Sequence, residues 1–337
     1  MKVAIVGGGS FDTLEYHLRE AFSFAGHDAR IFDIYDRWIY GRKTIGRYAR
    51  VVSKILRDYG SKFDASQFGS MAREVNDFGP NLVVCVYRFI PPQFVRDVKA
   101  AGRRVIHINP DQLTTLENQQ IFASDYDVWF TKDPYMLRFM RDKMNLNAVQ
   151  YNEAFNRRVH RRPETEKARL EEELDIDVLS FGSLYPYRTN MLACLQRQGV
   201  KLRIFGKTGR YPSPPDLKGC IEPRFILGEE KARYVCGARI VFNNLHYAEV
   251  ESVNNKFFEI NGMGGFQLCD YRPILRDLLP VDPEKVSFRT IGEAVSKIRY
   301  YLEHTDERRE IAERIYGHFA DNHSYDRLID HLLNHIS

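Results

Sequence analysis

Stretches of apolar residues alternate along the chain with stretches in which apolar residues recur at helical spacing. The apolar stretches are hydrophobic through their whole length rather than at every second position, which is typical of strands buried on both faces of a parallel sheet. In the first half of the chain the expected strands lie at residues 2–7, 27–34, 80–89, 103–109, 126–132 and 147–152. The alternation predicts an α/β domain with a doubly wound sheet.

The same alternation starts again after a charged stretch. Residues 156–175, NRRVHRRPETEKARLEEELD, carry many charges and almost no apolar pattern, which is typical of a boundary between domains. Beyond it the expected strands lie at 175–182, 200–206, 238–244 and 265–270, and the expected helices at 189–199, 228–237, 252–262, 291–303 and from 306 to the end, with a break at Asn322 and His323. The sequence therefore predicts a second doubly wound domain.

The expected architecture is two Rossmann-like domains that face a cleft. One domain covers residues 1–160, the other covers residues 170–320, and a C-terminal helix covers residues 321–337. Open parallel sheets bind ligands outside the carboxyl ends of their strands. The chemistry is therefore expected in the loops that follow the strands, on both sides of the cleft.

Composition narrows the class of protein. The chain is 44% hydrophobic, has no run of eighteen apolar residues, and begins with MKVAIVGGGS, which leads directly into an expected strand. We therefore expect a cytoplasmic protein without a membrane-spanning segment. Its five cysteines are widely spaced and form no C-x-x-C pair, which argues against a structural zinc site and against a disulfide framework.

A mild excess of positive charge is concentrated in two segments. The net charge is +4, and basic residues gather at 37–57 and at 156–164. Such segments suit phosphate-bearing ligands, nucleic acid or an anionic membrane surface, and they equally suit a solvated face. Aromatic residues lie among the basic ones of the first segment, so a nucleic-acid partner and peripheral contact with the inner membrane surface both stay open.

The first glycine-rich loop, VGGGSFDTLE, admits two interpretations. Gly7 and Gly9 match the first two glycines of a dinucleotide-binding motif, and Asp33 lies near the expected ribose-binding acid, which predicts an NAD-type oxidoreductase. The third glycine of the motif is replaced by Asp12. With Glu15 three residues later, Asp12 is expected to be the N-cap of a helix, which would place a carboxylate where a pyrophosphate should bind.

Two neighbouring loops of the second half combine small and positive residues at the end of a strand. Gly182, Ser183 and Arg188 follow one expected strand, and Gly206 and Lys207 follow the next. The carboxyl ends of parallel strands share one edge of the sheet, and the N-terminus of a helix attracts anions. The pattern therefore predicts a phosphate site at this edge.

The stretch 246–268, HYAEVESVNNKFFEINGMGGFQL, follows a third strand of the second half. If Ser252 caps a helix that ends near Gly262, Glu259 lies inside that helix, on a face shared with residues three and four positions earlier. Glu251 lies just before the start of that helix. Both glutamates could be ordinary surface charges, but the apolar neighbours of Glu259 and the nearby glycine turn favour contact with a ligand.

These residues carry a resemblance to a known family. The E-x7-E pair, the core NKFFEINGMGG, the earlier GSLYPYR and the tail HSYDRLIDHLL resemble the retaining glycosyltransferases of GT-B fold, and most of all their CgeB-like branch. At the level of motifs the resemblance covers most of residues 175–337, and before them it is architectural. It implies a hexosyltransferase-type enzyme that moves a sugar from a nucleotide diphosphate sugar, a UDP-sugar above all, to a glycan or lipid-linked acceptor. The donor would bind the C-terminal domain and the acceptor the N-terminal domain.

The resemblance also implies roles for individual residues. Glu259 would hydrogen-bond the ribose of the donor, and Glu251 would touch the donor sugar near the reacting face. Arg188 and Lys207 would neutralise the diphosphate leaving group. The complete donor-binding set implied in this way is Gly182, Ser183, Arg188, Gly206, Lys207, Asn255, Lys256 and Glu259. No D-x-D motif stands at a strand end, so neither a metal ion nor another cofactor is expected.

The segment between the two glutamates, SVNNKFF, is not glycine-rich as in larger retaining relatives, so the stereochemical outcome stays open. An inverting enzyme would need a general base from the N-terminal loops. Asp111, in the strand-end sequence INPDQ, is the first candidate for a catalytic base, although an Asp after Pro also suits a turn. On the acceptor side we expect Gly8, Gly9, Asp12 and His17.

Three alternatives to this function stay open. One is the NAD-type oxidoreductase, and another is a non-catalytic binding protein that keeps the fold. The third is a glycosyltransferase that uses the basic segment 37–57 to bind a nucleic-acid acceptor.

Overall fold

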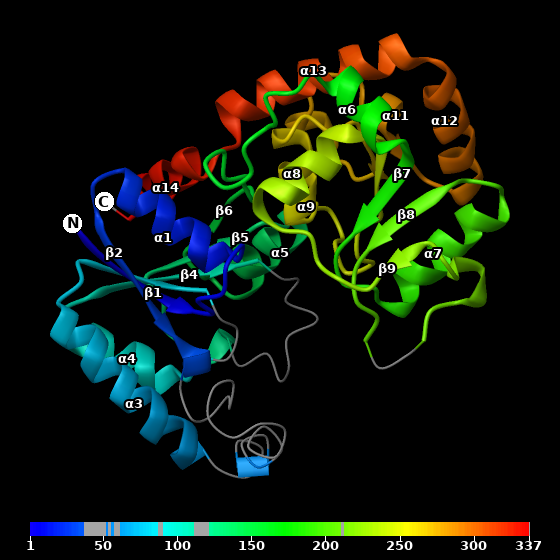
Figure 1. Cartoon of the computed structure of the whole chain (residues 1–337). Coiled ribbons are helices and arrows are strands. Elements are labelled where there is room, and N and C mark those ends of the chain that lie inside the picture. Colours follow the sequence, from blue (N-terminus) through cyan, green and yellow to red (C-terminus); the bar gives the residue numbers. More distant parts are fainter. Residues whose placement is uncertain are drawn as a thin grey trace. The chain divides into compact units, whose positions relative to one another are not determined.

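The chain divides into two compact units. The computed structural model describes residues 1–36, 61–86, 90–110, 121–209 and 212–336, with three single positions at 52, 55 and 56. Unit 1 consists of Met1–Asn152 and Tyr325–Ser337, and unit 2 of Glu153–Ser324 (Figure 1). Among the described residues each unit holds a six-stranded sheet whose strand pairs are all parallel, which confirms the predicted α/β class.

Unit 1 contains a sheet with the strand order β2-β1-β3-β4-β5-β6. Its strands are β1 (Lys2–Gly7), β2 (Asp28–Asp33), β3 (Leu82–Cys85), β4 (Arg104–Asn109), β5 (Val128–Thr131) and β6 (Ala148–Gln150). Each strand lies within a range predicted from the apolar runs. Every residue of β3 and β5 is buried, which explains why these strands are apolar throughout instead of alternating.

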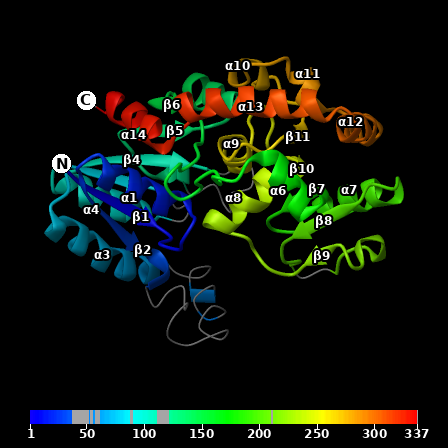
Figure 2. The same cartoon turned by 45° about the horizontal axis from the view of Figure 1, so that its top comes forward.

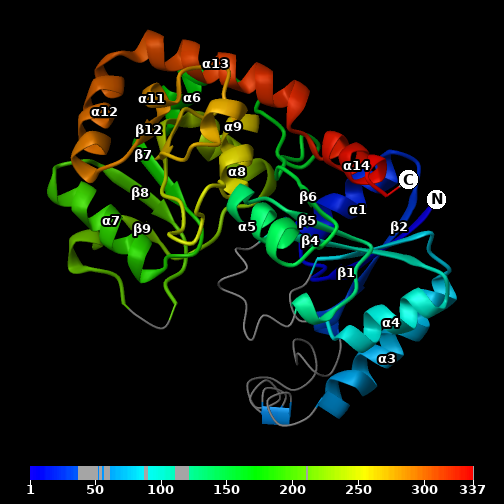
Figure 3. The ribbon, with the colours of Figure 1, turned by 180° about the vertical axis from the view of Figure 1, so that it is seen from behind.

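Helices cover both faces of this sheet. They are α1 (Leu14–Phe24), η1 (Ile34–Asp36), α3 (Ser61–Phe78), α4 (Pro92–Ala100), α5 (Pro134–Arg138), its π-helical continuation η5 (Phe139–Lys143) and α14 (Tyr325–Asn334). Figure 3 shows α3 and α4 side by side on one face, and Figure 1 shows α1 next to α14 on the other. The helix at the C-terminal end of the chain therefore completes the unit that the N-terminus begins.

Unit 2 contains a sheet with the strand order β12-β11-β10-β7-β8-β9. Its strands are β7 (Ile176–Phe181), β8 (Leu202–Phe205), β9 (Ile221–Glu222), β10 (Ala238–Asn243), β11 (Gln267–Asp270) and β12 (Ser287–Phe288). The four longer strands match predicted apolar runs. The two edge strands β9 and β12 span two residues each, too short to stand out as an apolar run, and the sequence pattern missed them.

The helices of unit 2 follow the predicted alternation. They are α6 (Lys167–Leu174), α7 (Pro186–Arg197), η6 (Pro215–Leu217), α8 (Gly228–Gly237), α9 (Asn255–Gly262), α10 (Leu275–Leu278), α11 (Pro283–Val286), α12 (Ile291–Glu303) and α13 (Thr305–Asn322). Figure 2 shows α13 as a long helix followed by α14. The chain leaves the helical conformation between them at His323 and Ser324, which confirms the predicted break.

The division after Asn152 differs from the predicted domain ranges of 1–160, 170–320 and 321–337. Phe155 is buried in the core of unit 2, and its ring packs so closely on Gly262 of α9 that any side chain there would overlap it. The N–H of Phe155 donates to the carbonyl of His323 at 3.1 Å, and Phe155 forms a parallel bridge with Ser324. The two segments at which the chain passes between the units therefore lie side by side within unit 2.

The charged stretch that resembled a linker is folded. Its second part forms α6, in which Lys167 and Glu171 are buried and lie 3.4 Å apart. Arg308 of α13 donates to the same Glu171 at 2.8 Å. Two charges of this stretch, Lys167 and Glu171, are thus paired inside unit 2, while most of its other charged residues are exposed. Among the described residues, no helix is long and apolar enough to cross a membrane.

Candidate functional site

Two glycines shape the carboxyl edge of the sheet in unit 2. Gly182 directly follows β7 with a φ of +108°, a conformation that favours glycine, and its N–H donates to the carbonyl of Phe205 at 2.9 Å. Gly206 directly follows β8 and packs on the carbonyl oxygen of Gly182, so a side chain there would overlap that oxygen. Both loops predicted to form the phosphate site therefore meet at this edge.

Arg188 lies beside Gly182. It stands in the first turn of α7, which begins three residues earlier than predicted, and it is 7% exposed. Its Nη1 donates to the carbonyl of Ser183 at 2.7 Å, and its Nε donates to Oδ1 of Asn244 at 3.1 Å. Burial lowers the pKa of Arg188 from its ordinary value, although a guanidinium stays protonated in proteins. These contacts fix a positive charge at the strand end.

Lys256 also lies beside Gly182. A methyl group on Gly182 would lie 3.5 Å from Nζ of Lys256 and 3.3 Å from Nη1 of Arg188. Nζ also donates to the carbonyl of Phe181 at 3.1 Å. Burial, reinforced by the charges of Arg188 and Lys231, lowers the pKa of Lys256 well below its ordinary value. An anion bound here would stabilise the charged form of this lysine.

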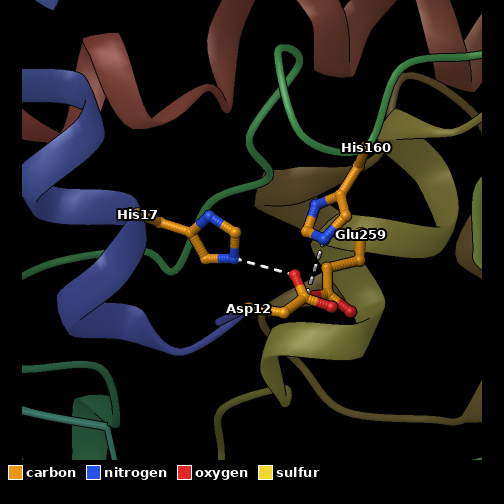
Figure 4. A group of neighbouring side chains, drawn as sticks. All are labelled: Asp12, His17, His160 and Glu259. Atoms are coloured by element: carbon orange, nitrogen blue, oxygen red, sulfur yellow. Dashed lines mark hydrogen bonds and ion pairs between the residues drawn. The ribbon is translucent and has the colours of Figure 1, made fainter. Parts of the chain in front are cut away.

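Glu259 is the carboxylate of the same cluster. It lies in α9 and is 4% exposed, and Nδ2 of Asn255 donates to its Oε1 at 2.9 Å, as the predicted helical face requires. Nζ of Lys231 lies 3.1 Å from its Oε2, and Nε2 of His160 lies 3.8 Å from its Oε1, the latter pair drawn in Figure 4. The carboxylate is therefore held in one orientation from three sides.

Lys231 and His160 were missed by sequence reasoning. Lys231 is 4% exposed although the helix GEEKARYVCG looks like an exposed, charged segment. One signal was available: Lys231 precedes the buried Val235 by four residues and so shares its face of α8. His160 is fully buried among the arginines of the charged stretch, where the sequence has no periodicity that would single it out.

The helix that carries Glu259 starts later than predicted. Asn254, and not Ser252, is its N-cap, since its Oδ1 accepts a hydrogen bond from the N–H of Phe257 at 3.0 Å. Glu251 consequently lies in the loop between β10 and α9, four residues before the helix, where it is partly buried. The helix fixes the direction of Glu259, whereas the position of Glu251 depends on the loop.

Lys207 and Ser183 belong to the outer part of the same edge. Both residues are exposed. Nζ of Lys207 lies 5.8 Å from the centre of the Phe225 ring, and the N–H of Leu184 donates to the carbonyl of Lys207 at 3.1 Å. Of the two residues predicted to neutralise the diphosphate, Arg188 is therefore buried next to Gly182, and Lys207 is exposed.

The N-cap at the first glycine-rich loop lies one residue after Asp12, the predicted position. Thr13 caps α1, with its hydroxyl accepting from the N–H of Tyr16 at 3.4 Å. Asp12 precedes it with a φ of +65°, and its Oδ1 lies 3.0 Å from Nε2 of His17, as Figure 4 shows. Two of the predicted acceptor-side residues therefore form a buried pair in unit 1.

The carboxylate of Glu15 accepts the hydrogen bond from a backbone N–H group that a bound dinucleotide would need. The N–H of Gly8 donates to Oε1 of Glu15 at 2.7 Å, and a side chain on Gly7 would overlap Glu15. Burial raises the pKa of Glu15. Gly9 packs beside Asp33, whose Oδ2 lies 3.0 Å from the position of a methyl group on Gly9. This arrangement disfavours a nicotinamide dinucleotide in the loop.

Some predicted features lie outside the described residues. They are Asp111 and the basic segment 37–57 apart from its three single positions. Their roles stay predictions.

Comparison with known proteins agrees with the geometry of unit 2. Residues 188–334 match the family described as glycosyl transferase-like, and this range includes the cluster of Lys256 with the buried Arg188, Lys231 and Glu259. Solved glycosyltransferases share the arrangement of both sheets over nearly the whole chain. The chain has the GT-B fold of these glycosyltransferases. The predicted two-domain architecture and the resemblance to the CgeB-like branch are thereby confirmed.

Individual relatives of this GT-B protein span most of its length. The spore protein CgeB of Bacillus subtilis (strain 168) is 25% identical over 258 residues, which cover 67% of this chain and 78% of CgeB. Anabaena HepE in complex with UDP-glucose is 10% identical, covers 99% of each chain and has a TM-score of 0.69. Sucrose-phosphate synthase from Thermosynechococcus elongatus is 12% identical, with 99% of this chain and 98% of that chain covered and a TM-score of 0.68.

A more distant GT-B relative acts on DNA. T4 phage β-glucosyltransferase, solved with its UDP-glucose substrate, is 12% identical over 100% of both chains with a TM-score of 0.55, and it is described as a DNA-modifying enzyme. At such identities the likeness shows the fold alone.

Proposed function

We propose that the protein transfers a sugar from a nucleoside diphosphate sugar, a UDP-sugar above all, to a glycan or lipid-linked acceptor without needing a metal ion. One observation carries the proposal: the oriented carboxylate of Glu259 and the cations Arg188 and Lys256 are built into the carboxyl edge of one parallel sheet. A nucleoside diphosphate offers hydroxyls to the carboxylate and negative charge to the cations.

The cations would act on the leaving group. Departure of a nucleoside diphosphate builds negative charge on its terminal phosphate, and preorganised positive groups stabilise that charge without rearranging. Arg188 and Lys256 are the built-in candidates, together with the N-terminal end of the twelve-residue helix α7. Because Lys207 is exposed and lies over the Phe225 ring, its role is better described as contact with the outer part of the donor.

The carboxylates would act on the sugars of the donor. Glu259 would accept hydrogen bonds from the ribose hydroxyls while Asn255 and Lys231 hold it in place. Glu251, in the loop before α9, is proposed to contact the transferred sugar. Asp111 stays the candidate base for an inverting reaction.

The preference for UDP rests on the relatives. HepE and the phage enzyme were both solved with UDP-glucose. A thermal-shift panel of UDP, GDP, ADP, CMP and TDP with their sugars tests the preference, because a ligand present at about 100 times its Kd stabilises the folded state by about 2.7 kcal/mol. We expect UDP and one UDP-sugar to raise the Tm most. A panel without any shift at millimolar concentration contradicts the proposed donor site.

The panel also tests metal independence and the oxidoreductase alternative. We expect the shift with UDP to persist in excess EDTA, because Arg188 and Lys256 supply the positive charge. NADH should produce no shift, because Glu15 occupies the amide of Gly8. The variant Glu259→Gln should lose the shift with UDP, whereas Glu229→Gln, at an exposed position of α8, should retain it. Equal shifts in both variants would favour a non-catalytic binding protein over the enzyme.

A nucleic-acid acceptor is the second candidate. The basic segment 37–57 and the fold shared with a DNA-modifying enzyme favour it. Binding to DNA that weakens steeply between 50 and 200 mM salt, as expected for on the order of 6–10 phosphate contacts, would support this acceptor, and absence of binding at low salt would remove it. Flotation with anionic lipid vesicles tests in the same way whether a lipid-linked acceptor brings the protein to a membrane surface.

A further inference from the structure

Four aromatic rings lie in contact at the carboxyl edge of the sheet in unit 2. The ring centres of Tyr185 and His246 are 6.1 Å apart, those of His246 and Tyr247 are 4.1 Å apart, and those of Tyr247 and Tyr187 are 6.0 Å apart. Two of these residues follow β7 and two follow β10. We refer to the set Tyr185, Tyr187, His246 and Tyr247 as the aromatic platform.

The aromatic platform is exposed. Tyr185 is 55% exposed, Tyr187 is 37% exposed and Tyr247 is 69% exposed, while His246 is partly buried. Soluble proteins seldom leave several large rings together in water, and such groups mark contacts with a ligand or partner. Tyr300 of α12 shows the difference, because it is also exposed but stacks on His304 at 3.8 Å and donates to Glu307 at 2.8 Å.

We propose that the aromatic platform binds a pyranose ring of a saccharide. The face of an aromatic ring is electron-rich, and the axial C–H groups of a pyranose are electron-poor, so the two surfaces attract each other while the sugar hydroxyls point outward. Tyrosine and histidine add polar edges that can hydrogen-bond those hydroxyls. This inference rests on the proposed function, and it names the part of the chain that recognises the sugar.

Charged groups border the platform on the side of Tyr187. Asp270, at the end of β11, and Arg272, two residues later, both act electrostatically on Tyr187, whose pKa is raised by burial and by Asp270. Asp270 is fixed because its Oδ2 accepts from the N–H of Leu245 at 2.7 Å, and Arg272 is fixed because its Nε donates to the carbonyl of Glu249 at 2.7 Å. A carboxylate and a guanidinium in fixed positions suit paired hydroxyls of a sugar.

The platform is continuous with the proposed donor site. Tyr187 directly precedes Arg188, and His246 and Tyr247 stand in the loop that leads to Asn254, the cap of the helix carrying Glu259. A pyranose on the platform would therefore belong either to the sugar of the donor or to a saccharide acceptor. The donor sugar and a saccharide acceptor would both present a pyranose ring to the platform, and the experiment below distinguishes between them.

Two binding measurements on the full chain test the platform. The first compares the Kd of UDP with the Kd values of UDP-glucose, UDP-galactose and UDP-N-acetylglucosamine by calorimetry. The second measures binding to a glycan array at saturating UDP and without UDP. The variants are Tyr247→Ala and Tyr187→Ala, with Tyr247→Phe retaining the ring and Tyr300→Ala removing an exposed tyrosine elsewhere in unit 2.

If the platform binds the donor sugar, the Tyr247→Ala variant binds the preferred UDP-sugar roughly 3- to 10-fold more weakly than the wild type does. The Kd of UDP itself stays unchanged. If the platform binds an acceptor, the same variant shows binding to the array glycans that is weaker than that of the wild type by a similar factor. Tyr247→Phe retains most of the binding in either case, and Tyr300→Ala changes neither measurement.

The inference is overturned if both alanine variants match the wild type in the two measurements, or if the wild type binds neither the array glycans nor a UDP-sugar better than UDP. Failure of the proposed donor site gives a different result, namely a wild type that binds no nucleotide. In that case the array without UDP still decides whether Tyr247 holds a saccharide.

Discussion

Nζ of Lys231 lies 3.1 Å from Oε2 of Glu259, and both side chains are buried. A buried carboxylate costs free energy unless a positive partner and hydrogen bonds accompany it. Lys231 supplies the charge, and Asn255 supplies a hydrogen bond to the other oxygen. Lys231 is therefore a positioning residue for Glu259.

We predict that Lys231→Met lowers the free energy of unfolding by about 3 kcal/mol, because removing one partner leaves a buried charge without compensation. The Kd for the preferred nucleotide should rise at least about tenfold, since Glu259 loses its orientation. Denaturant unfolding and calorimetry measure the two effects. The double variant Lys231→Met with Glu259→Gln should lose less unfolding free energy than the two single variants lose together. A loss equal to the sum of the two single losses would contradict an interaction between the two side chains.

The glycine edge gives a second prediction. Gly182→Ala should lower the free energy of unfolding by about 1–3 kcal/mol, because its φ of +108° strains any other residue. The added methyl group would also press on Arg188 and Lys256, so UDP binding should weaken. Gly209→Ala is the control, because a methyl group there meets no atom within 4 Å, and it should change stability by less than about 0.5 kcal/mol. Equal stability of the two variants would contradict the strain at Gly182.

His323, between α13 and α14, makes stability depend on pH. Burial, and secondarily the charge of His318, lowers the pKa of His323 to about 4 in the folded protein, whereas an unfolded histidine titrates near 6.5. The neutral form is therefore favoured by folding, so the contribution of His323 to stability is fully present above pH 6.5 and is lost as the pH falls toward 4.

We expect wild-type protein to lose about 2–3 kcal/mol more stability between pH 6.5 and pH 4 than the variant His323→Phe. Phenylalanine keeps the aromatic contacts with Phe258 and Phe319 but binds no proton. Denaturant unfolding at several pH values measures the free energy of unfolding of both proteins. The titration of other groups cancels when the value of the variant is subtracted from that of the wild type. Parallel pH profiles would show that His323 does not titrate in this way.

The C-terminal helix gives a prediction for unit 1. Leu332 of α14 is fully buried, so Leu332→Ala should lower the free energy of unfolding by about 2–5 kcal/mol. Asp330→Ala, on the exposed side of the same helix, should stay within about 0.5 kcal/mol of the wild type. If α14 were an independent appendage, neither variant would alter the unfolding of unit 1, as followed by the fluorescence of its buried Trp129.

The sequence predicted most of the fold because the sheets are parallel and buried. Strands such as β1 and β10 contain the apolar runs VAIV and IVF and end in glycine or asparagine, so length and composition identify them. The pattern failed where few residues carry the signal, as in the two-residue strands β9 and β12. It also misjudged the charged stretch, because ion pairing such as that of Glu171 with Arg308 is a tertiary property.

The candidate site was predictable only in part. Glu259, Asn255 and Arg188 stand in local patterns that indicate a helix face or a strand end, and the structure brings them into one cluster with Lys256. Lys231 comes from another helix, and its burial depends on how α8 and α9 pack together. Local signals placed a cap at Asp12 and Ser252, and the observed caps lie one and two residues later, where the side chains of Thr13 and Asn254 accept the capping hydrogen bonds.

The return of the chain to unit 1 has a consequence for biosynthesis. Residues 1–152 leave the ribosome first, but the face of α1 that packs on α14 stays uncovered until residues 325–336 have been synthesised. Unit 2, which is continuous in sequence, can complete its core earlier. The unit begun first is therefore finished last, and a nascent chain that stalls before residue 325 exposes the apolar side of α1 to chaperones.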